Sequence, residues 1–188
     1  MPKFQEKGWK VPERTEIRFG GSGGQGVVLA AQILGKAAVL DGRNALQTQA
    51  YGAEARGSLT KSEVIISGDK IGFPAVRKCD ILVTMSQEAT NGLLKDLKET
   101  GTLIVDSSSV KDVPATKAVV RGFSITETAR TKFGNALYAN MVMLGVLTRM
   151  TQIVSTNSVE EAIKERTTSK TAETNVKAFR EGLLLEPL

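Results

Sequence analysis

The chain has 188 residues, of which 41% are hydrophobic, a length typical of one domain with a single buried core. One cysteine and no histidine exclude an internal disulfide, a self-contained iron–sulfur or four-cysteine zinc site and histidine-based catalysis, so we expect no metal site and no catalytic residue in this chain alone. The formal net charge of +5 comes without a dense basic stripe, so nucleic acid is not an expected partner.

Charged and aromatic side chains near the start predict an N-terminal arm at residues 1–14, ahead of one domain at residues 15–188. Short apolar or alternating runs in that domain predict strands at 16–19, 44–49, 59–67, 81–85 and 103–105. Longer apolar segments predict helices at 27–40, 86–97, 136–150 and 171–180, with capping boxes at 124–127 and 158–161 and a turn at Gly101. Strands and helices alternate, which indicates the α/β class: a single-domain, three-layer fold with helices on both faces of a mostly parallel sheet.

The sequence carries no sign of a membrane segment. No stretch reaches the roughly 18 uncharged apolar residues of a spanning helix, and the start MPKFQEKGWKVPERTE lacks the apolar core of a signal peptide. We expect a soluble, cytoplasmic protein with no membrane partner.

A glycine-rich loop joins the first predicted strand to the first predicted helix. It matches G-x-G-x-x-G, a pattern in which glycine backbone comes close to phosphate at a helix N-terminus. A dinucleotide site also needs an acid at the end of the second strand, and the only nearby acid, Asp41, precedes that strand. A tight turn that binds no ligand stays open as an alternative. The loop residues are Gly21, Ser22, Gly23, Gly24, Gln25 and Gly26.

A second loop, YGAEARG, follows the second predicted strand and is hard to explain by packing. An arginine among glycines is costly to order unless its guanidinium meets a carboxylate or a phosphate. If the strand order allows it, this loop and the glycine loop face one site. A solvated loop with a local acid–arginine pair is the alternative. The residues of interest are Tyr51, Glu54, Arg56 and Gly57.

Two asparagines stand at the start of the apolar segment at 136–150. Asn140 must be hydrogen-bonded if it is buried, either to the backbone of a neighbouring segment or across an interface. For Asn135 and Asn140 we expect a structural role.

Taken together, these motifs resemble the gamma subunit of the 2-oxoacid:ferredoxin oxidoreductases, in order across about residues 15–182. The form G-S-G-G-Q-G looks closer to the 2-oxoglutarate enzymes than to the pyruvate enzymes, which more often have arginine in place of the serine; the pyruvate and ketoisovalerate types are related. The segments that carry the resemblance are GGSGGQGVVLAAQIL, YGAEARG followed by SEVIIS, CDILVTMSQEA, GTLIVDSS and GNALYANMVMLG.

The resemblance implies one subunit of an enzyme that decarboxylates a 2-oxoacid on thiamine diphosphate, sends electrons through iron–sulfur clusters to ferredoxin and transfers the acyl group to coenzyme A. Thiamine diphosphate, Mg and the clusters are then expected in alpha and beta partners, with a possible ferredoxin-like delta subunit. This chain lacks a G-D-G…N thiamine motif and a set of cysteines. Its two loops are expected to line the coenzyme A side of the active site or to contact a partner, with Arg56 on a phosphate or a partner carboxylate. An assembly subunit without ligand contacts and a free-standing nucleotide-binding protein are the alternatives.

Overall fold

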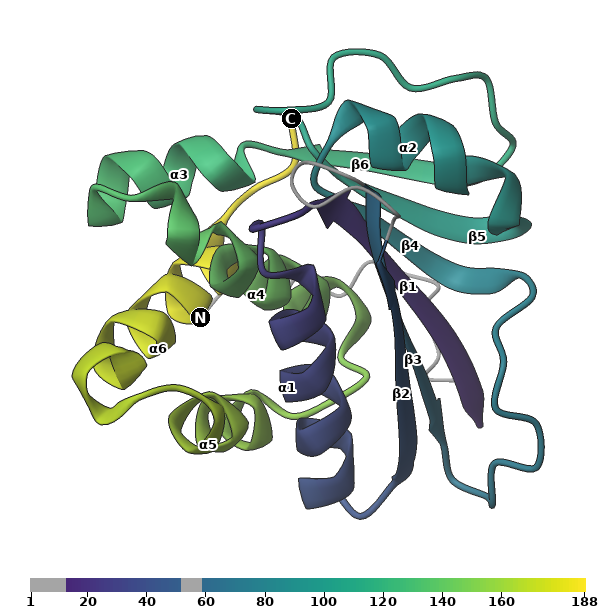
Figure 1. Cartoon of the computed structure of the whole chain (residues 1–188), viewed down its shortest axis with the longest axis horizontal. Helices are drawn as coiled ribbons and strands as arrows, with labels where there is room; N and C mark the ends of the chain where they lie inside the picture. The colour runs from purple at the N-terminus through teal and green to yellow at the C-terminus, as the bar shows by residue number, and fades with distance from the viewer. Residues whose placement is uncertain (1–12, 52–58) are drawn as a thin grey trace.

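The computed structural model describes residues 13–51 and 59–188, and the side chain of Tyr51 lies outside the described part. The predicted arm, apart from its last residues, is therefore outside the description, as are Glu54, Arg56 and Gly57 of the second loop. The described residues form one α/β unit around a central sheet (Figure 1).

Six strands of the described chain form one sheet in the order β2-β3-β1-β4-β5-β6. The pairs β1–β4, β4–β5 and β5–β6 are parallel, whereas β3 runs antiparallel to both β1 and β2. The sheet is therefore mixed, with parallel pairing over most of its width. The strands are β1 (Arg14–Ser22), β2 (Asn44–Tyr51), β3 (Leu59–Ser67), β4 (Cys79–Thr84), β5 (Leu97–Asp106) and β6 (Val119–Phe123).

Helices cover both faces of the sheet, which gives three layers (Figure 1). Side chains alternate along each strand, so Ile17 and Val83 face the larger core while Leu82 faces the smaller one on the opposite side. The larger core packs against α1 (Val27–Leu40), α3 (Ile125–Phe133), α4 (Ala139–Thr151), α5 (Thr156–Arg166) and α6 (Ser169–Leu184). The smaller core packs against α2 (Gln87–Leu93) through Ala89 and Leu93.

Helices α4 and α6 cross with their backbones in contact. A methyl group added to Gly145 of α4 would lie 2.8 Å from the Cα of Gly182 in α6, and one added to Gly182 would lie 3.0 Å from the Cα of Gly145. No side chain separates the two helices at this crossing.

The predicted fold class is confirmed, and α1 and β3 have the predicted bounds. The helix predicted at 86–97 is wrong at its end, because α2 stops at Leu93, a 3-10 turn (Leu94–Asp96) follows, and Leu97 opens β5. The turn predicted at Gly101 is also wrong, since this glycine lies inside β5. Strand β6 was not predicted.

The two predicted capping boxes are wrong. Ser124 precedes α3 without a side-chain cap, and α5 begins earlier than predicted, with Ser155 accepting a hydrogen bond from the Ser158 amide. The pattern at Ser124 therefore gave the correct N-cap position without the capping hydrogen bond, and the pattern at Ser158 gave the wrong position.

Candidate functional site

The strand directions bring several loops to one edge of the sheet. Strands β1, β4, β5 and β6 are parallel, so the segments that follow them leave at the same edge. Strand β2 points the same way, because β1 and β2 are both antiparallel to β3. In an open α/β sheet this carboxyl edge is the usual place for a ligand.

The glycine loop leaves β1 at this edge and enters α1 through two left-handed residues. Gly24 has φ +96° and Gly26 has φ +72°, a region that residues with a side chain rarely adopt. Gly26 is the N-cap of α1, no side chain among the described residues caps this end, and the first turn holds no acid. The first N–H groups of a fourteen-residue helix are therefore left for an anion or for solvent.

Gln25 holds the loop in shape. Its Oε1 accepts a hydrogen bond from the Ser22 amide at 2.7 Å, and its Nε2 donates to the Met85 carbonyl at 2.8 Å. The loop after β1 is thereby tied to the end of β4. Both ends of the Gln25 amide are occupied within the chain, which gives this residue a positioning role.

A pocket of about 270 Å³ adjoins the glycine loop. Arg130 of α3 contributes an exposed guanidinium, and within the described chain this group has no hydrogen-bond or ion-pair partner. A free guanidinium beside an uncapped helix N-terminus makes this edge attractive to phosphate or carboxylate. The pocket is lined by Gly24, Gln25, Met85, Ser109, Thr126, Arg130, Asn135, Ala136, Leu137 and Ala139.

Asp106, the last residue of β5, organises the far wall of this pocket. Its fully buried carboxylate accepts hydrogen bonds from the Ser108 amide at 3.1 Å and the Ser109 hydroxyl at 3.1 Å. It also accepts from the Thr126 amide at 3.1 Å and the Thr126 hydroxyl at 2.5 Å. Asp106 therefore fixes the loop after β5 to the start of α3, the helix that carries Arg130.

The two asparagines have local contacts near the pocket. Asn140 is 4% exposed, and its Nδ2 donates to the Gly26 carbonyl at 3.3 Å, while its buried Oδ1 has no partner in the described chain. Asn135 lines the pocket and accepts a hydrogen bond from the Leu137 amide at 2.9 Å. Asn140 thus joins α4 to the first turn of α1.

The second predicted loop starts and ends beside the glycine loop. Ser22 at the end of β1 pairs with Leu59 at the start of β3, and Tyr51 at the end of β2 pairs with Thr60. The residues that join Tyr51 to Leu59 lie outside the described part, so the loop between them stays a prediction. The strand order places both ends of this loop at the edge of the sheet that carries the glycine loop.

Asp41, the acid considered above for a dinucleotide site, instead forms hydrogen bonds within the chain. Asp41 lies at the far end of α1, where its carboxylate accepts hydrogen bonds from the Ser155 amide, the Ser155 hydroxyl and the Ser158 hydroxyl at 2.6 to 2.7 Å. Burial alone would raise the pKa of Asp41, but the hydrogen bonds from Ser158 and Ser155 outweigh it and lower this pKa. In addition, β3 separates β1 from β2, unlike the adjacent parallel strands of a dinucleotide-binding unit.

The described residues contain no group of three or more His, Cys, Asp or Glu side chains that could hold a metal ion. The thiol of Cys79 is buried, and burial raises its pKa to about 12, so it is not a thiolate nucleophile. None of the helices in the described ranges has the length and hydrophobicity needed to cross a membrane.

Sequence reasoning missed most of the pocket wall. Thr126 and Arg130 of α3 meet Ser109, which follows β5, and Met85, which follows β4, only in the fold. The one local signal was an aspartate at the end of a buried strand followed by three serines, which is typical of a hydrogen-bonded turn.

The structure is therefore an α/β domain with a pocket at the carboxyl ends of its parallel strands, and the groups in this pocket attract anions. The family model for pyruvate ferredoxin/flavodoxin oxidoreductase matches residues 16–185, and the chain belongs to this family. The resemblance seen in the sequence motifs is therefore confirmed.

Individual relatives agree with this assignment. The chain is 46% identical over 176 residues to the 2-oxoglutarate synthase subunit KorC of Methanocaldococcus jannaschii, covering 92% of this chain and 94% of that protein. Its structure matches the crystal structure of the keto/oxoacid ferredoxin oxidoreductase gamma subunit from Geobacter sulfurreducens with a TM-score of 0.81. The two sequences are 42% identical, and the match covers 90% of this chain and 96% of that one. The structure also matches part of the 2-oxoglutarate:ferredoxin oxidoreductase of Magnetococcus marinus with a TM-score of 0.82, over 92% of this chain and 31% of that one. The sequence identity is 20%, so this match shows a shared fold alone.

Proposed function

We propose that the chain is the gamma subunit of a cytoplasmic, multi-subunit 2-oxoglutarate:ferredoxin oxidoreductase. The enzyme would convert 2-oxoglutarate into its coenzyme A thioester and pass the electrons to ferredoxin. The 46% identity to a 2-oxoglutarate synthase subunit over nearly the full length of both chains supports this choice of oxoacid. In this proposal residues 15–188 are the gamma-type domain, residues 1–14 are an arm, and alpha and beta subunits, with or without a delta subunit, complete the enzyme.

The redox cofactors belong to the partners in this proposal. The described residues offer no cluster of metal-ligating side chains, and the buried Cys79 is the chain's sole cysteine. A chain with one buried cysteine and no described cluster of metal ligands does not fit an iron–sulfur cluster or Mg-bound thiamine diphosphate. We therefore assign no reaction step that uses these cofactors to this chain. Its contribution would be to bind and orient coenzyme A, the acyl acceptor.

The observation that carries this assignment is the free Arg130 guanidinium in the pocket next to the uncapped start of α1. Phosphates of coenzyme A would meet the N–H groups at the start of α1 and the guanidinium, two kinds of donor that suit phosphate. Gly24 leaves the backbone open, since a methyl group added there would find no atom within 4 Å. In the same proposal Gly21 to Gly26 and the loop with Tyr51, Glu54, Arg56 and Gly57 line this site or contact a partner.

A second role, contact with a partner subunit, has its own observation. Leu137 at the rim of the pocket is 69% exposed and presents an apolar side chain to the solvent beside the polar site. A partner subunit that covers Leu137 would close the pocket from one side. Assembly and coenzyme A binding would then share one edge of the sheet.

The test replaces Arg130 by alanine in the assembled enzyme and measures the coenzyme A dependence of 2-oxoglutarate oxidation. Loss of one charged hydrogen bond of about 1.5–3 kcal/mol predicts a rise of roughly tenfold to a hundredfold in the KM for coenzyme A. Arg166→Ala on α5 is the matched control, because Arg166 is exposed and lies in a helix that does not line the pocket.

An unchanged KM in the assembled Arg130→Ala enzyme removes this residue from the site. Loss of assembly without a selective effect on coenzyme A favours the contact role. Arg56→Ala, read in the same assay, tests the predicted loop in the same way.

A further inference from the structure

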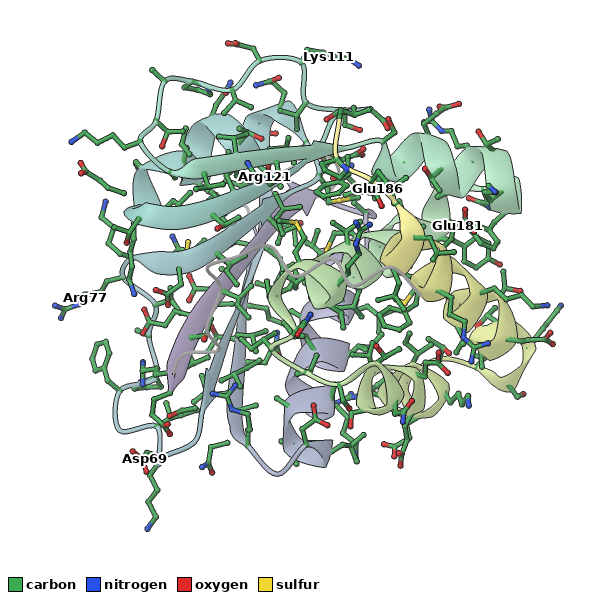
Figure 2. All side chains as sticks on the ribbon, turned by 180° about the vertical axis from the view of Figure 1, so that it is seen from behind. Asp69, Arg77, Lys111, Arg121, Glu181 and Glu186 are labelled. Atoms are coloured by element: carbon green, nitrogen blue, oxygen red, sulfur yellow. The ribbon has the colours of Figure 1, made fainter. Side chains whose placement is uncertain are left out.

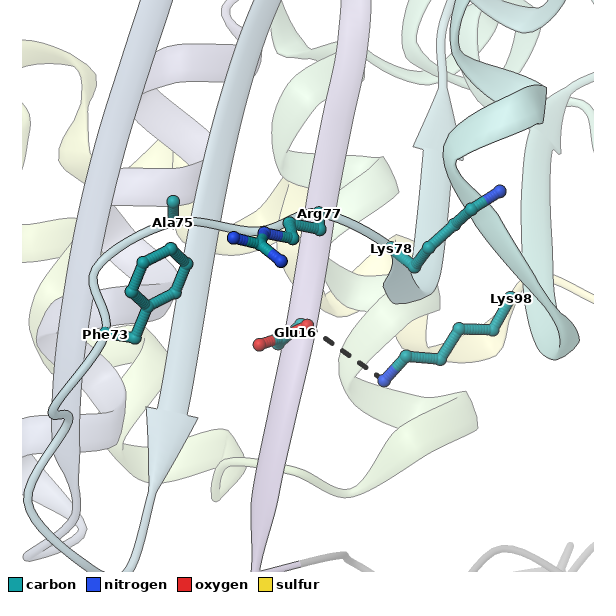
Figure 3. Close-up of a pocket in the computed structure, with 6 residues that line it drawn as sticks. All are labelled: Glu16, Phe73, Ala75, Arg77, Lys78 and Lys98. Carbon is teal, nitrogen blue, oxygen red and sulfur yellow. Dashed lines mark ion pairs between the residues drawn. The ribbon is translucent and has the colours of Figure 1, made fainter.

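Figure 3 shows a second hollow, of about 410 Å³. It lies at the opposite edge of the sheet from the glycine loop. It sits at the amino ends of β1, β4 and β5, beside the segment of residues 68–78 that joins β3 to β4. Figure 2 shows the two edges: Lys111, which follows β5, and Asp69, which follows β3, lie at opposite ends of the molecule. We call it the basic hollow; its lining residues are Glu16, Phe73, Ala75, Arg77, Lys78 and Lys98.

Two acids at this hollow, Glu16 and Asp80, each have an ion-pair partner in the described chain. Glu16 forms an ion pair with Arg14 at 2.8 Å, and Lys98 forms one with Asp80 at 2.7 Å. The Lys98 ammonium also lies 4.0 Å from the Glu16 carboxylate. These four side chains therefore balance one another, and neither carboxylate pairs with Arg77 or Lys78 in the described chain.

The two remaining cations have no carboxylate partner in the described part of the chain. The Lys78 ammonium donates to the Lys95 carbonyl, which leaves its charge without a counter-ion. The Arg77 guanidinium carbon lies 5.3 Å from the centroid of the Phe73 ring. An arginine stacked on an aromatic ring keeps its N–H edge free for a carboxylate.

Phe73 adds an apolar anchor to this charged surface. Its side chain is 50% exposed, and it lies in a segment that runs without helix or strand. The segment is nevertheless held in place, since the Phe73 carbonyl accepts from Arg14 at 3.3 Å and the Val76 carbonyl accepts from the buried Arg18 at 2.8 Å. An exposed aromatic next to an arginine on a fixed segment is the composition typical of the centre of a protein interface.

We propose that the basic hollow docks an acidic segment of a partner polypeptide within the enzyme complex. The segment would place an apolar side chain on Phe73 and separate carboxylates on Arg77 and Lys78. In Figure 3 the Arg77 guanidinium points towards Phe73 whereas the Lys78 ammonium points away from it, so the two cations fit successive carboxylates of a chain better than one small anion. The proposal rests on the multi-subunit function proposed above, and it concerns the edge of the sheet away from the pocket.

The first test measures lysine acetylation in the full chain alone and in the complex purified through a tag on this chain. Lys78 should react more slowly in the complex, and a carbodiimide should join it to a glutamate or aspartate of another subunit, identified by mass spectrometry. Lys170 at the start of α6 is the control, because it is exposed and lies far along the chain from the basic hollow. Equal reactivity of Lys78 in both samples overturns the proposal, as does a cross-link to a second copy of this chain.

The second test reverses charge in the double variant Arg77→Glu/Lys78→Glu and compares it with Lys170→Glu. Association with the other subunits should weaken about tenfold at low salt for the double variant alone, with a smaller difference at high salt, where charge attraction is screened. The proposal is overturned if the double variant unfolds at the same temperature as the wild type, and so is correctly folded, but associates with the other subunits as strongly as the wild type does. An equal loss of association in Lys170→Glu also overturns it, because the loss would then follow net charge and not the basic hollow.

The two proposals fail in different ways. A chain that purifies with no other polypeptide overturns both the proposed function and the docking site. A complex that oxidises 2-oxoglutarate while Lys78 stays fully reactive overturns the docking site alone.

Discussion

Substitution of Gly26 by alanine tests the structure of the glycine loop most directly. Gly26 has φ +72°, a backbone conformation in which alanine would cost about 1–2 kcal/mol of strain. The added methyl would also collide with the Asn140 amide, since it would lie 2.9 Å from Cγ and 3.2 Å from Cβ of that residue. Asn140 is 4% exposed and has little room to move, so we expect a further cost of about 1–3 kcal/mol from overpacking.

Gly42→Ala provides a matched control for this variant. Gly42 has φ +77°, but a methyl added there would find no atom within 4 Å. The two alanine variants therefore share the backbone strain and the lower entropy of the unfolded chain, and they differ only in the collision. Urea unfolding of the full chain should show a free energy of unfolding lowered by about 2–5 kcal/mol for Gly26→Ala and about 1–2 kcal/mol for Gly42→Ala.

A double-mutant cycle isolates the collision itself. Asn140→Ala alone removes one hydrogen bond and should lower the free energy of unfolding by about 0.5–1.5 kcal/mol. In the Asn140→Ala background, Gly26→Ala should cost less than in the wild type by about 1–3 kcal/mol. Equal costs for the Gly26 and Gly42 variants, or an equal cost of Gly26→Ala in both backgrounds, refute the reasoning.

Two further predictions concern stability. Asp106→Asn replaces a buried acceptor of four hydrogen bonds and should lower the free energy of unfolding by about 2–3 kcal/mol. Asp112→Asn, at an exposed position, is the control and should leave the free energy of unfolding unchanged. Similar values for the two variants would contradict the role of Asp106. The hydrogen bonds from Arg180 lower the pKa of Glu160 below its ordinary 4.5, so their stabilisation is present above that pH and is lost as the pH falls through the lower folded-state value. In urea unfolding at a series of pH values, Arg180→Ala should differ from the wild type near neutrality and converge with it in acid. A difference that persists at the lowest pH would show that Glu160 is not the linked group.

The fold was predictable wherever local sequence carried the signal. Helix α1 is a long apolar run between Gly26 and Asp41, and β3 alternates up to Gly68, so their bounds followed directly from the residues. Strand β6 was missed because it is short and mostly partly exposed, and because it forms only by pairing with the distant β5.

The site was predictable only in part. The position of the glycine loop followed from its motif, and the strand order then placed the ends of the second loop beside it. Arg130 was not found, because nothing in its own helix distinguishes it from other surface arginines until α3 is fixed by Asp106. Contacts of this kind join elements far apart in the sequence, and a local pattern does not contain them.

The contact between Gly145 and Gly182 limits how this subunit can move. Because backbone meets backbone there, α4 cannot slide along α6 or rotate against it without a collision. These two helices should therefore respond to a ligand as one rigid pair. Movement of α4 caused by a ligand near Asn140 would carry α6 with it.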